Sequence, residues 1–161
     1  MPTLLVVHHS PTPAVQALTD VVVAGARDDA IDGVDVVVRP ALEATADDVL
    51  AADGFLLGTT ANFGYMSGAL KHFFDSVFLE AGGALSDDGS AAGGSGGRRP
   101  FGLWVHGRYD TTGAVRSVET IVRALPWTQA APVLEVLGEV TEEHRTAAYD
   151  LGATVAALLS D

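Results

Sequence analysis

The sequence predicts an α/β fold in which helices cover both faces of an open, parallel sheet. Short apolar runs, of which TLLVVH at positions 3–8 is the first, alternate with segments of helical periodicity along the chain. Strands that are apolar on both faces are typical of a parallel sheet buried between two layers of helices. A closed eight-stranded barrel needs about 250 residues, whereas this chain has 161. We therefore expect a single domain, residues 1–161, around an open sheet of about five strands.

The first helix is predicted between Ala14 and Asp29. Its N-terminus carries the usual signals, because Thr12 is a suitable N-cap and Pro13 occupies the first helical position. The apolar residues of this segment recur at helical spacing and form one stripe: Val15, Leu18, Val22 and Ala26. This pattern predicts a helix that packs one face against the sheet.

Two further strands are predicted on either side of a short helix. The run VDVVVRP, at Val34–Pro40, is a strand that its proline ends. Thr45, followed by two acidic residues, predicts the start of a short helix in TADDVLAAD. The apolar run GFLLGT, at Gly54–Thr59, is the third strand.

An amphipathic helix follows the third strand, and the periodicity then stops. The helix is marked by apolar residues at i, i+3, i+4 and i+7: Leu70, Phe73, Phe74 and Val77. Between Gly82 and Arg99 the chain is rich in Gly and Ser. That composition indicates a flexible insertion, residues 82–99, because the alternation of strands and helices resumes directly after it.

The last third of the chain completes the alternation. PFGLWVHG predicts the fourth strand, and TTGAVRSVETIVRALPW predicts a helix with a capping Thr and a proline stop. The run Pro132–Val140 is the fifth strand, and a final helix follows with Thr141 as its N-cap.

Composition excludes several classes of function. The net charge is −12, with 9 Lys and Arg against 21 Asp and Glu. This balance argues against general binding to nucleic acid or to anionic membranes, both of which need clustered cations. The chain has no Cys, which excludes disulfides and thiolate chemistry. It also shows no signal peptide and no apolar run of about 18 residues that would span a bilayer, so a cytoplasmic location is expected.

The ligand site of such a sheet is expected at the carboxyl ends of the strands. Three strand exits are unusually polar and rich in Gly: HSPTPA after the first strand, TTANFGYMS after the third and HGRYDTTGA after the fourth. The first places the hydroxyls of Ser10 and Thr12 beside a helix N-terminus, whose free N–H groups suit a phosphate. The alternative is that Thr12 only caps the helix. No Walker A motif and no dinucleotide-binding GxGxxG motif is present.

The other two exits supply aromatic rings and glycines that leave the backbone accessible. Phe63, Tyr65 and Tyr109 offer ring faces, whereas Gly64 and Gly107 permit close approach of the backbone. A phosphate at the first exit and a planar heteroaromatic ring at the other two describe a mononucleotide, and flavin mononucleotide (FMN) matches best.

At these residues the chain resembles the flavodoxin-like superfamily, particularly its multimeric flavodoxins, WrbA-type quinone reductases and NAD(P)H-dependent FMN reductases. The motif DGFLLGTTANFGYMSGALKHFFD carries the resemblance most strongly, and HHSPTP resembles the phosphate loop of that superfamily. The chain departs from the pattern at Pro13 and Val15, and it has Thr60 or Ala61 in place of a proline. The resemblance implies a three-layer α-β-α sandwich with a five-stranded parallel sheet of order 2-1-3-4-5.

The resemblance also implies non-covalent FMN, with NAD(P)H as an electron donor and no catalytic side chain or metal. The implied cofactor-binding residues lie in the three exits: Ser10, Thr12, Ala14, Val15, Thr60, Ala61, Asn62, Phe63, Gly64, His106, Gly107, Arg108, Tyr109 and Asp110. Two functions follow from it, of which the first is expected and the second is the alternative. One is an NAD(P)H-dependent oxidoreductase that reduces quinones or similar acceptors, in a homodimer or larger assembly. The other is an electron-transfer flavodoxin that shuttles electrons between protein partners.

Two side chains of the fourth-strand exit have alternative interpretations. His106 is either a pocket residue or a structural histidine. Arg108 contacts a flavin carbonyl or a nicotinamide cofactor's phosphate in one interpretation, and it pairs with Asp110 in the other.

Overall fold

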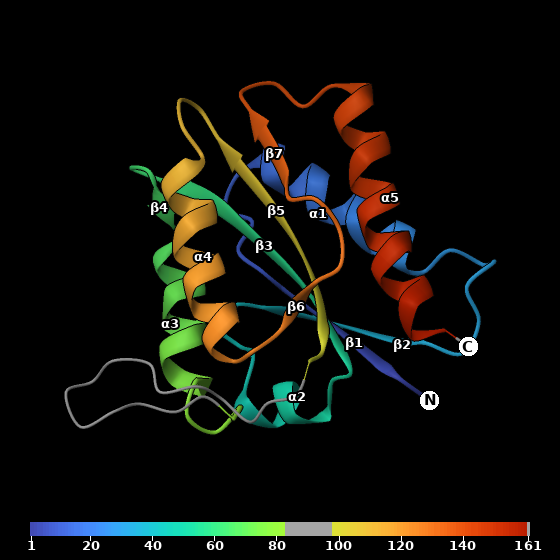
Figure 1. The fold of residues 1–161 in the computed structure, drawn as a ribbon. Coiled ribbons are helices and arrows are strands. Elements are labelled where there is room, and N and C mark those ends of the chain that lie inside the picture. The colour runs from blue at the N-terminus through green and yellow to red at the C-terminus, as the bar shows by residue number, and fades with distance from the viewer. Residues whose placement is uncertain (83–97, 161) are drawn as a thin grey trace.

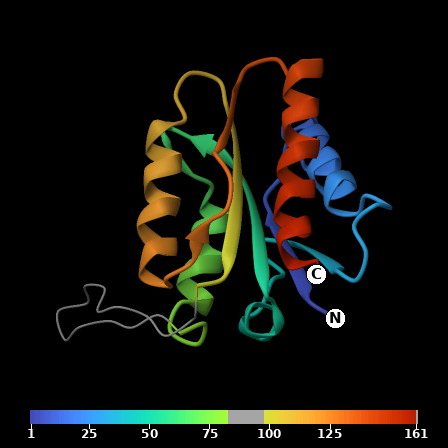
Figure 2. The ribbon, with the colours of Figure 1, turned by 45° about the vertical axis from the view of Figure 1, so that its right-hand side comes forward.

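The structure, a computed structural model, describes residues 1–82 and 98–160. A parallel sheet lies between two layers of helices, with α3 and α4 on one side and α1 and α5 on the other (Figures 1 and 2). The strands are β1 (Thr3–His8), β2 (Asp35–Pro40), β3 (Gly54–Asn62), β4 (Tyr65–Met66), β5 (Pro100–Gly107), β6 (Thr128–Gln129) and β7 (Leu134–Leu137). The helices are α1 (Pro13–Ala26), α2 (Ala46–Ala51), α3 (Gly68–Val77), α4 (Thr112–Ala124) and α5 (Glu142–Leu159). No helix in these ranges is long and apolar enough to cross a bilayer.

The predicted fold class is confirmed, and the strand order differs in one detail. The sheet runs β2-β1-β3-β5, and the position of the fifth strand is divided between β6 and β7, which pair with the two ends of β5. The predicted strand Pro132–Val140 is therefore too long. Pro132 has no N–H to donate to a ladder, and Gly138, with a φ of 75°, leaves the extended conformation.

Alternate residues of the central strands face the two helical layers. Phe55 and Leu57 of β3 pack with the α3 and α4 side, whereas Leu56 packs with α1 and α5. Trp104 of β5 also faces α1 and α5 and is fully buried. Its indole ring occupies the space that a Cβ at Gly58 would need, so a glycine is required at that position of β3.

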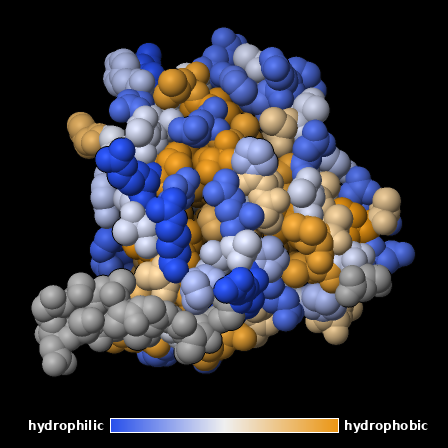
Figure 3. All heavy atoms as spheres, in the orientation of Figure 1, coloured by the Kyte–Doolittle hydropathy of each residue, from blue (hydrophilic) through white to orange (hydrophobic). Residues whose placement is uncertain are grey.

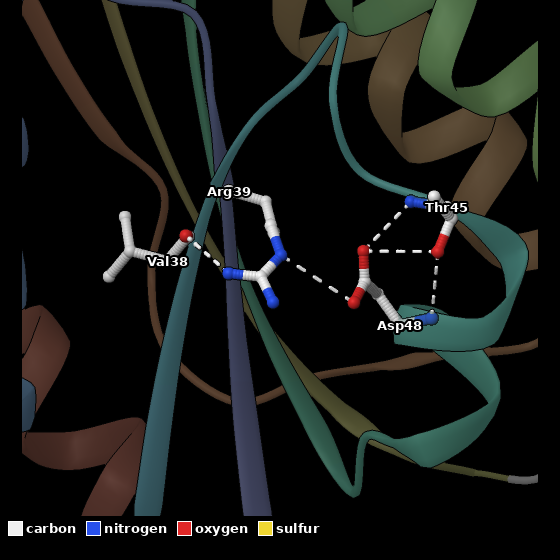
Figure 4. A network of polar contacts seen from close by, with 4 residues as sticks. All are labelled: Val38, Arg39, Thr45 and Asp48. Carbon is white, nitrogen blue, oxygen red and sulfur yellow. Dashed lines mark hydrogen bonds and ion pairs between the residues drawn. The ribbon is translucent and has the colours of Figure 1, made fainter.

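Polar contacts secure the ends of α2. Thr45 and Asp48 form a capping box, and the Asp48 carboxylate also lies 3.6 Å from the Arg39 guanidinium of β2 (Figure 4). At the other end of the helix, Arg99 donates to the carbonyls of Val49 and Ala52. Burial lowers the pKa of Arg99.

Arg99 is the last residue of the predicted insertion 82–99. Its guanidinium lies 4.9 Å from the centre of the Phe55 ring. Phe55 in turn stacks on Trp127 at a centroid distance of 3.7 Å. Residues 83–97 of the insertion lie outside the described part of the chain.

The N-caps at Thr12, Thr45 and Thr141 are confirmed, and the cap predicted for α4 is wrong. Thr111 stands at its N-cap position without capping it, because the Thr111 hydroxyl donates to the Glu135 carboxylate at 2.7 Å. The carboxylate of Asp110 accepts the Thr112 N–H at 2.9 Å instead.

Helices α1 and α5 approach so closely that their backbones touch. A Cβ at Gly152 would collide with the Val22 carbonyl, and one at Gly25 would collide with the Tyr149 carbonyl. The two glycines therefore set the distance between the helices.

We predict that Gly152→Ala lowers the free energy of unfolding by about 2 kcal/mol, because the added methyl group forces the helices apart. Gly68→Ala is the matched control, since a Cβ there meets no atom within 4 Å. Urea denaturation of both variants measures the difference. Equal stability of the two would show that the α1–α5 contact tolerates the extra methyl group.

Candidate functional site

The loops that follow β1, β3, β5 and β7 meet at one edge of the sheet and border an open cavity of about 780 Å³. This volume lies within the range of ligand pockets. Residues from all four loops line the cavity: Thr12, Pro13, Ala14, Thr60, Ala61, His106, Gly107, Arg108, Tyr109, Gly138 and Glu139. A second hollow of about 480 Å³ shares Ala61, Arg108 and Tyr109 with it and adds Asn62, Phe63, Gly64 and Asp110.

The exit of β3 is a tight hairpin held by a buried hydroxyl. Thr59 donates to the Thr60 carbonyl at 2.8 Å and accepts the Ser67 N–H at 2.9 Å. The chain then reverses through Phe63 and Gly64, whose φ angles of 51° and 77° are both left-handed, and returns as β4. Positive φ at both central residues is typical of a two-residue hairpin turn. The polar, glycine-marked junction is therefore a hairpin that leaves the Phe63 ring fully exposed.

This hairpin rests directly on α4. A Cβ at Gly113, in the first turn of that helix, would collide with the Gly64 carbonyl oxygen. Gly107 is similarly confined, since a Cβ there would lie 3.1 Å from the Ala61 Cβ. The two exits of β3 and β5 therefore form one packed wall of the site.

Thr60 contributes a buried hydroxyl without a partner. The residue lines the larger cavity and is 7% exposed, and its hydroxyl oxygen is buried. Within residues 1–82 and 98–160, its Oγ1 makes no hydrogen bond. A buried hydroxyl of this kind is unfavourable unless something satisfies it.

The hydroxyl of Ser10 points into the fold. Thr19 donates to the Val15 carbonyl at 3.0 Å, so its oxygen accepts from Ser10 at 2.8 Å. The Ser10 oxygen then accepts from Nδ1 of His8 at 2.8 Å, which fixes the tautomer of that ring. Burial, together with the neighbouring His9, lowers the pKa of His8. Ser10 consequently lines neither hollow.

The N-terminus of α1 offers a reduced set of donors. The Val15 N–H is bound by the Thr12 hydroxyl at 3.4 Å, and Val15 itself is fully buried. Pro11 and Pro13 have no N–H. Among the described residues, no acceptor is found for the amides of Thr12 and Ala14 or for the hydrogen of the Thr12 hydroxyl, so these donors can serve a ligand.

The exit of β5 adds a positioned imidazole and a cation. His106 donates through Nε2 to the Gly138 carbonyl at 2.7 Å. Asp110 accepts the N–H of Thr112, and this hydrogen bond lowers the pKa of its carboxyl group. The alternative in which Arg108 pairs with Asp110 is not found, since no ion pair of Arg108 is present in the described part of the chain. Arg108 is exposed and lines both hollows.

Twelve of the fourteen predicted residues line the two hollows, and Ser10 and Val15 do not. The sequence interpretation missed Pro13, Gly138 and Glu139, which also line the larger cavity. The glycine of LGEV, directly after the last apolar strand, was a usable signal for a fourth loop at this edge.

A separate groove of about 340 Å³ lies between α5 and the segment that leads into β7. Figure 3 shows apolar atoms gathered on this face, between α4 and α5. The groove is lined mainly by Ala, Val, Leu and Pro side chains and brings few polar groups together. We therefore place the site at the strand ends, where polar groups from four loops converge.

We predict that Gly113→Ala displaces the hairpin at residues 61–66, because the new methyl group occupies the position of the Gly64 carbonyl oxygen. Amide hydrogen exchange should become faster at Asn62 and Tyr65, the pair that flanks the turn and closes the hairpin. Gly68→Ala, at the start of α3, is the control and should leave these rates unchanged. Unaltered protection in Gly113→Ala would contradict the close contact between α4 and the hairpin.

No protein-family model matches the sequence. A flavodoxin of Aquifex aeolicus is 35% identical over 92 residues, which are 57% of this chain and 48% of that protein. The match thus spans about half the length of this curated relative.

Solved structures match over nearly the whole chain. A flavodoxin from the domain Archaea has a TM-score of 0.78 at 16% identity, with 98% of each chain covered. A Streptococcus pneumonia flavodoxin has a TM-score of 0.75 at 21% identity, covering 97% of this chain and 99% of its own. A WrbA-like flavodoxin from Agrobacterium tumefaciens has a TM-score of 0.73 at 16% identity, covering 99% and 98%. The chain therefore has the flavodoxin fold.

Proposed function

We propose that the cavity at the strand ends binds FMN non-covalently and that the protein transfers electrons through it. One observation carries this proposal: in a flavodoxin fold, the exits of β1, β3, β5 and β7 converge on one open cavity of about 780 Å³ at the carboxyl ends of the strands. This edge of an open parallel sheet, with polar groups from several loops around a concave surface, is where such folds bind their ligands.

The donor set fits the parts of FMN. The free amides at the start of α1 and the Thr12 hydroxyl suit the phosphate, and Arg108 is a cation within reach of the same cavity. Gly64, where a Cβ would meet no atom within 4 Å, lets the backbone approach a flat ring. Phe63 and Tyr109, which are both exposed, offer ring faces at its edge.

FMN supplies the redox chemistry when it is bound, and the protein supplies position and electrostatics. Thr12 and Ala14 would hold the phosphate, and the Thr60–Gly64 and Gly107–Asp110 segments would hold the ring. The hydrogen bond from His106 to the Gly138 carbonyl fixes the imidazole against the fourth loop, so this wall of the cavity is preformed.

Of the two functions, we favour an electron carrier that docks on protein partners. The net charge of −12 suits docking on a basic partner. The rings of Phe63 and Tyr109, 110% and 87% exposed, stand at the mouth of the site, where a partner would meet the cofactor. The curated relative is itself named a flavodoxin.

One observation favours the second function, the NAD(P)H-dependent reduction of quinones. The 480 Å³ hollow beside the main cavity is bounded by Phe63, Arg108 and Tyr109, which gives room for a second planar molecule next to a cation.

We predict that the protein binds FMN with a stoichiometry of one, measured by quenching of flavin fluorescence. Thr12→Ala should weaken binding by about 1–2 kcal/mol, because a hydrogen bond to a charged phosphate is lost. Thr12→Ser keeps the hydroxyl and should bind as tightly as the wild type. Absence of FMN binding by the wild-type protein would exclude both proposed functions.

We further predict that the chemically reduced, FMN-loaded protein passes electrons rapidly to cytochrome c, used as a basic acceptor protein. The rate should fall as ionic strength rises, because salt screens the attraction between the acidic carrier and its partner. NADH and NADPH should reduce the loaded protein slowly in the absence of a reductase. Fast, NAD(P)H-driven reduction of benzoquinone would instead establish the second function.

A further inference from the structure

In the described part of the chain, the sheet has one long free edge, which is formed by β2. At the opposite side of the sheet, β6 and β7 are only two and four residues long, and they lie beside different ends of β5. Strand β2 runs for six residues and ends the strand order, with β1 as its neighbour. A free edge of this length is a template on which another strand can add.

The backbone groups of β2 are divided between the two sides of the strand. The N–H groups of Asp35 and Ala41 donate to the carbonyls of residues 2 and 8, at 2.8 and 2.7 Å, so both residues face β1. Successive residues of a strand direct their N–H and C=O groups to opposite sides. The residues between them that face the free edge are therefore Val36, Val38 and Pro40.

All three carbonyls at this edge already accept hydrogen bonds within the chain. Arg27, directly after α1, donates to the Val36 carbonyl at 3.1 Å. Arg39 donates to the Val38 carbonyl at 3.3 Å (Figure 4). The Pro40 carbonyl accepts two N–H groups of the turn that follows, and Pro40 has no N–H to offer. Side chains and a turn thus take the place that a neighbouring strand would occupy.

The edge is self-complementary for a second copy of the chain. In an antiparallel arrangement centred on Val37, Val36 of each copy lies opposite Val38 of the other, and each such pair can exchange two hydrogen bonds. The same register places Asp35 of each copy opposite Arg39 of the other, and both side chains are exposed. Opposite charges at facing positions of neighbouring strands stabilise the pairing. Two-fold symmetry provides every one of these contacts twice.

We propose that the β2 edge is a pairing surface for a second copy of this chain and that Arg27 holds it closed. Arg27 makes the shorter of the two arginine bonds, whereas Arg39 covers only the carbonyl of the residue next to it. Arg39 would exchange Asp48, 3.6 Å away, for the Asp35 carboxylate of the other copy, so its charge stays paired. None of these residues lines the cavity at the strand ends, so the proposal does not depend on a bound flavin.

The experiment measures self-association by sedimentation velocity over a wide range of protein concentration. Raised ionic strength screens the repulsion between two acidic chains. Arg27→Ala removes the donor to the Val36 carbonyl, and Arg27→Met removes it while keeping the length of the side chain. Arg116→Ala, at an exposed position of α4, is the control with the same change of charge. Circular dichroism establishes that each variant is folded.

Arg27→Ala and Arg27→Met should each self-associate at least about tenfold more tightly than the wild type, because the uncovered carbonyl can accept a hydrogen bond from another copy. In concentrated Arg27→Ala, amide hydrogen exchange should slow at Val36 and Val38, whose N–H groups become paired. Arg116→Ala should behave as the wild type does. Adding Asp35→Arg to Arg27→Ala should abolish the association, because it places like charges opposite one another.

Two kinds of result would overturn the proposal. If Arg27→Ala and Arg27→Met sediment as the wild type does at every concentration, the edge is not a pairing surface. If they associate while the Val36 and Val38 amides exchange as fast as in the wild type, or if adding Asp35→Arg leaves the association unchanged, the two copies meet through a different surface.

Discussion

The parallel register of β3 between β1 and β5 is the constraint on which the rest of the structure depends. His8 pairs with Gly58, and Thr60 pairs with His106, so the three strands end at nearly the same level. Every backbone group of a central strand must find its partner in the adjacent strands. Shifting β3 by one residue would exchange its two faces. Thr59 would then face the cavity, and Thr60 would face α3.

The same register determines how the helices are placed. The Trp104 ring occupies the space that a side chain at Gly58 would fill. Helices α1 and α5 can lie against one another only because Gly25 and Gly152 carry no side chain. On the opposite face, the contact between Gly113 and the Gly64 carbonyl joins α4 to the hairpin. Four glycines thus mark the places where backbones or large rings meet, and three of them lie inside regular helices, where propensity alone disfavours glycine.

The fold was predictable from the sequence because alternation of buried strands and amphipathic helices is a strong, repeated signal. The loops of the site were predictable because parallel strands place their carboxyl ends together. The division of the last strand was not predictable, because a two-residue strand such as Thr128–Gln129 has no periodicity. The orientation of Ser10 was also beyond the sequence, since it depends on Thr19, nine residues later, and on the tautomer of His8. Composition shows that hydroxyls are present at a loop, but only tertiary contacts decide which of them turn inward.

Phe63 has a left-handed φ of 51°, which residues other than glycine rarely adopt. Its ring is fully exposed. Glycine or asparagine would adopt the same φ of 51° with less strain. The ring buries no surface on folding, so its retention adds to the cost of the native state without a gain in core packing. Folding stability alone would therefore favour glycine or asparagine at this position.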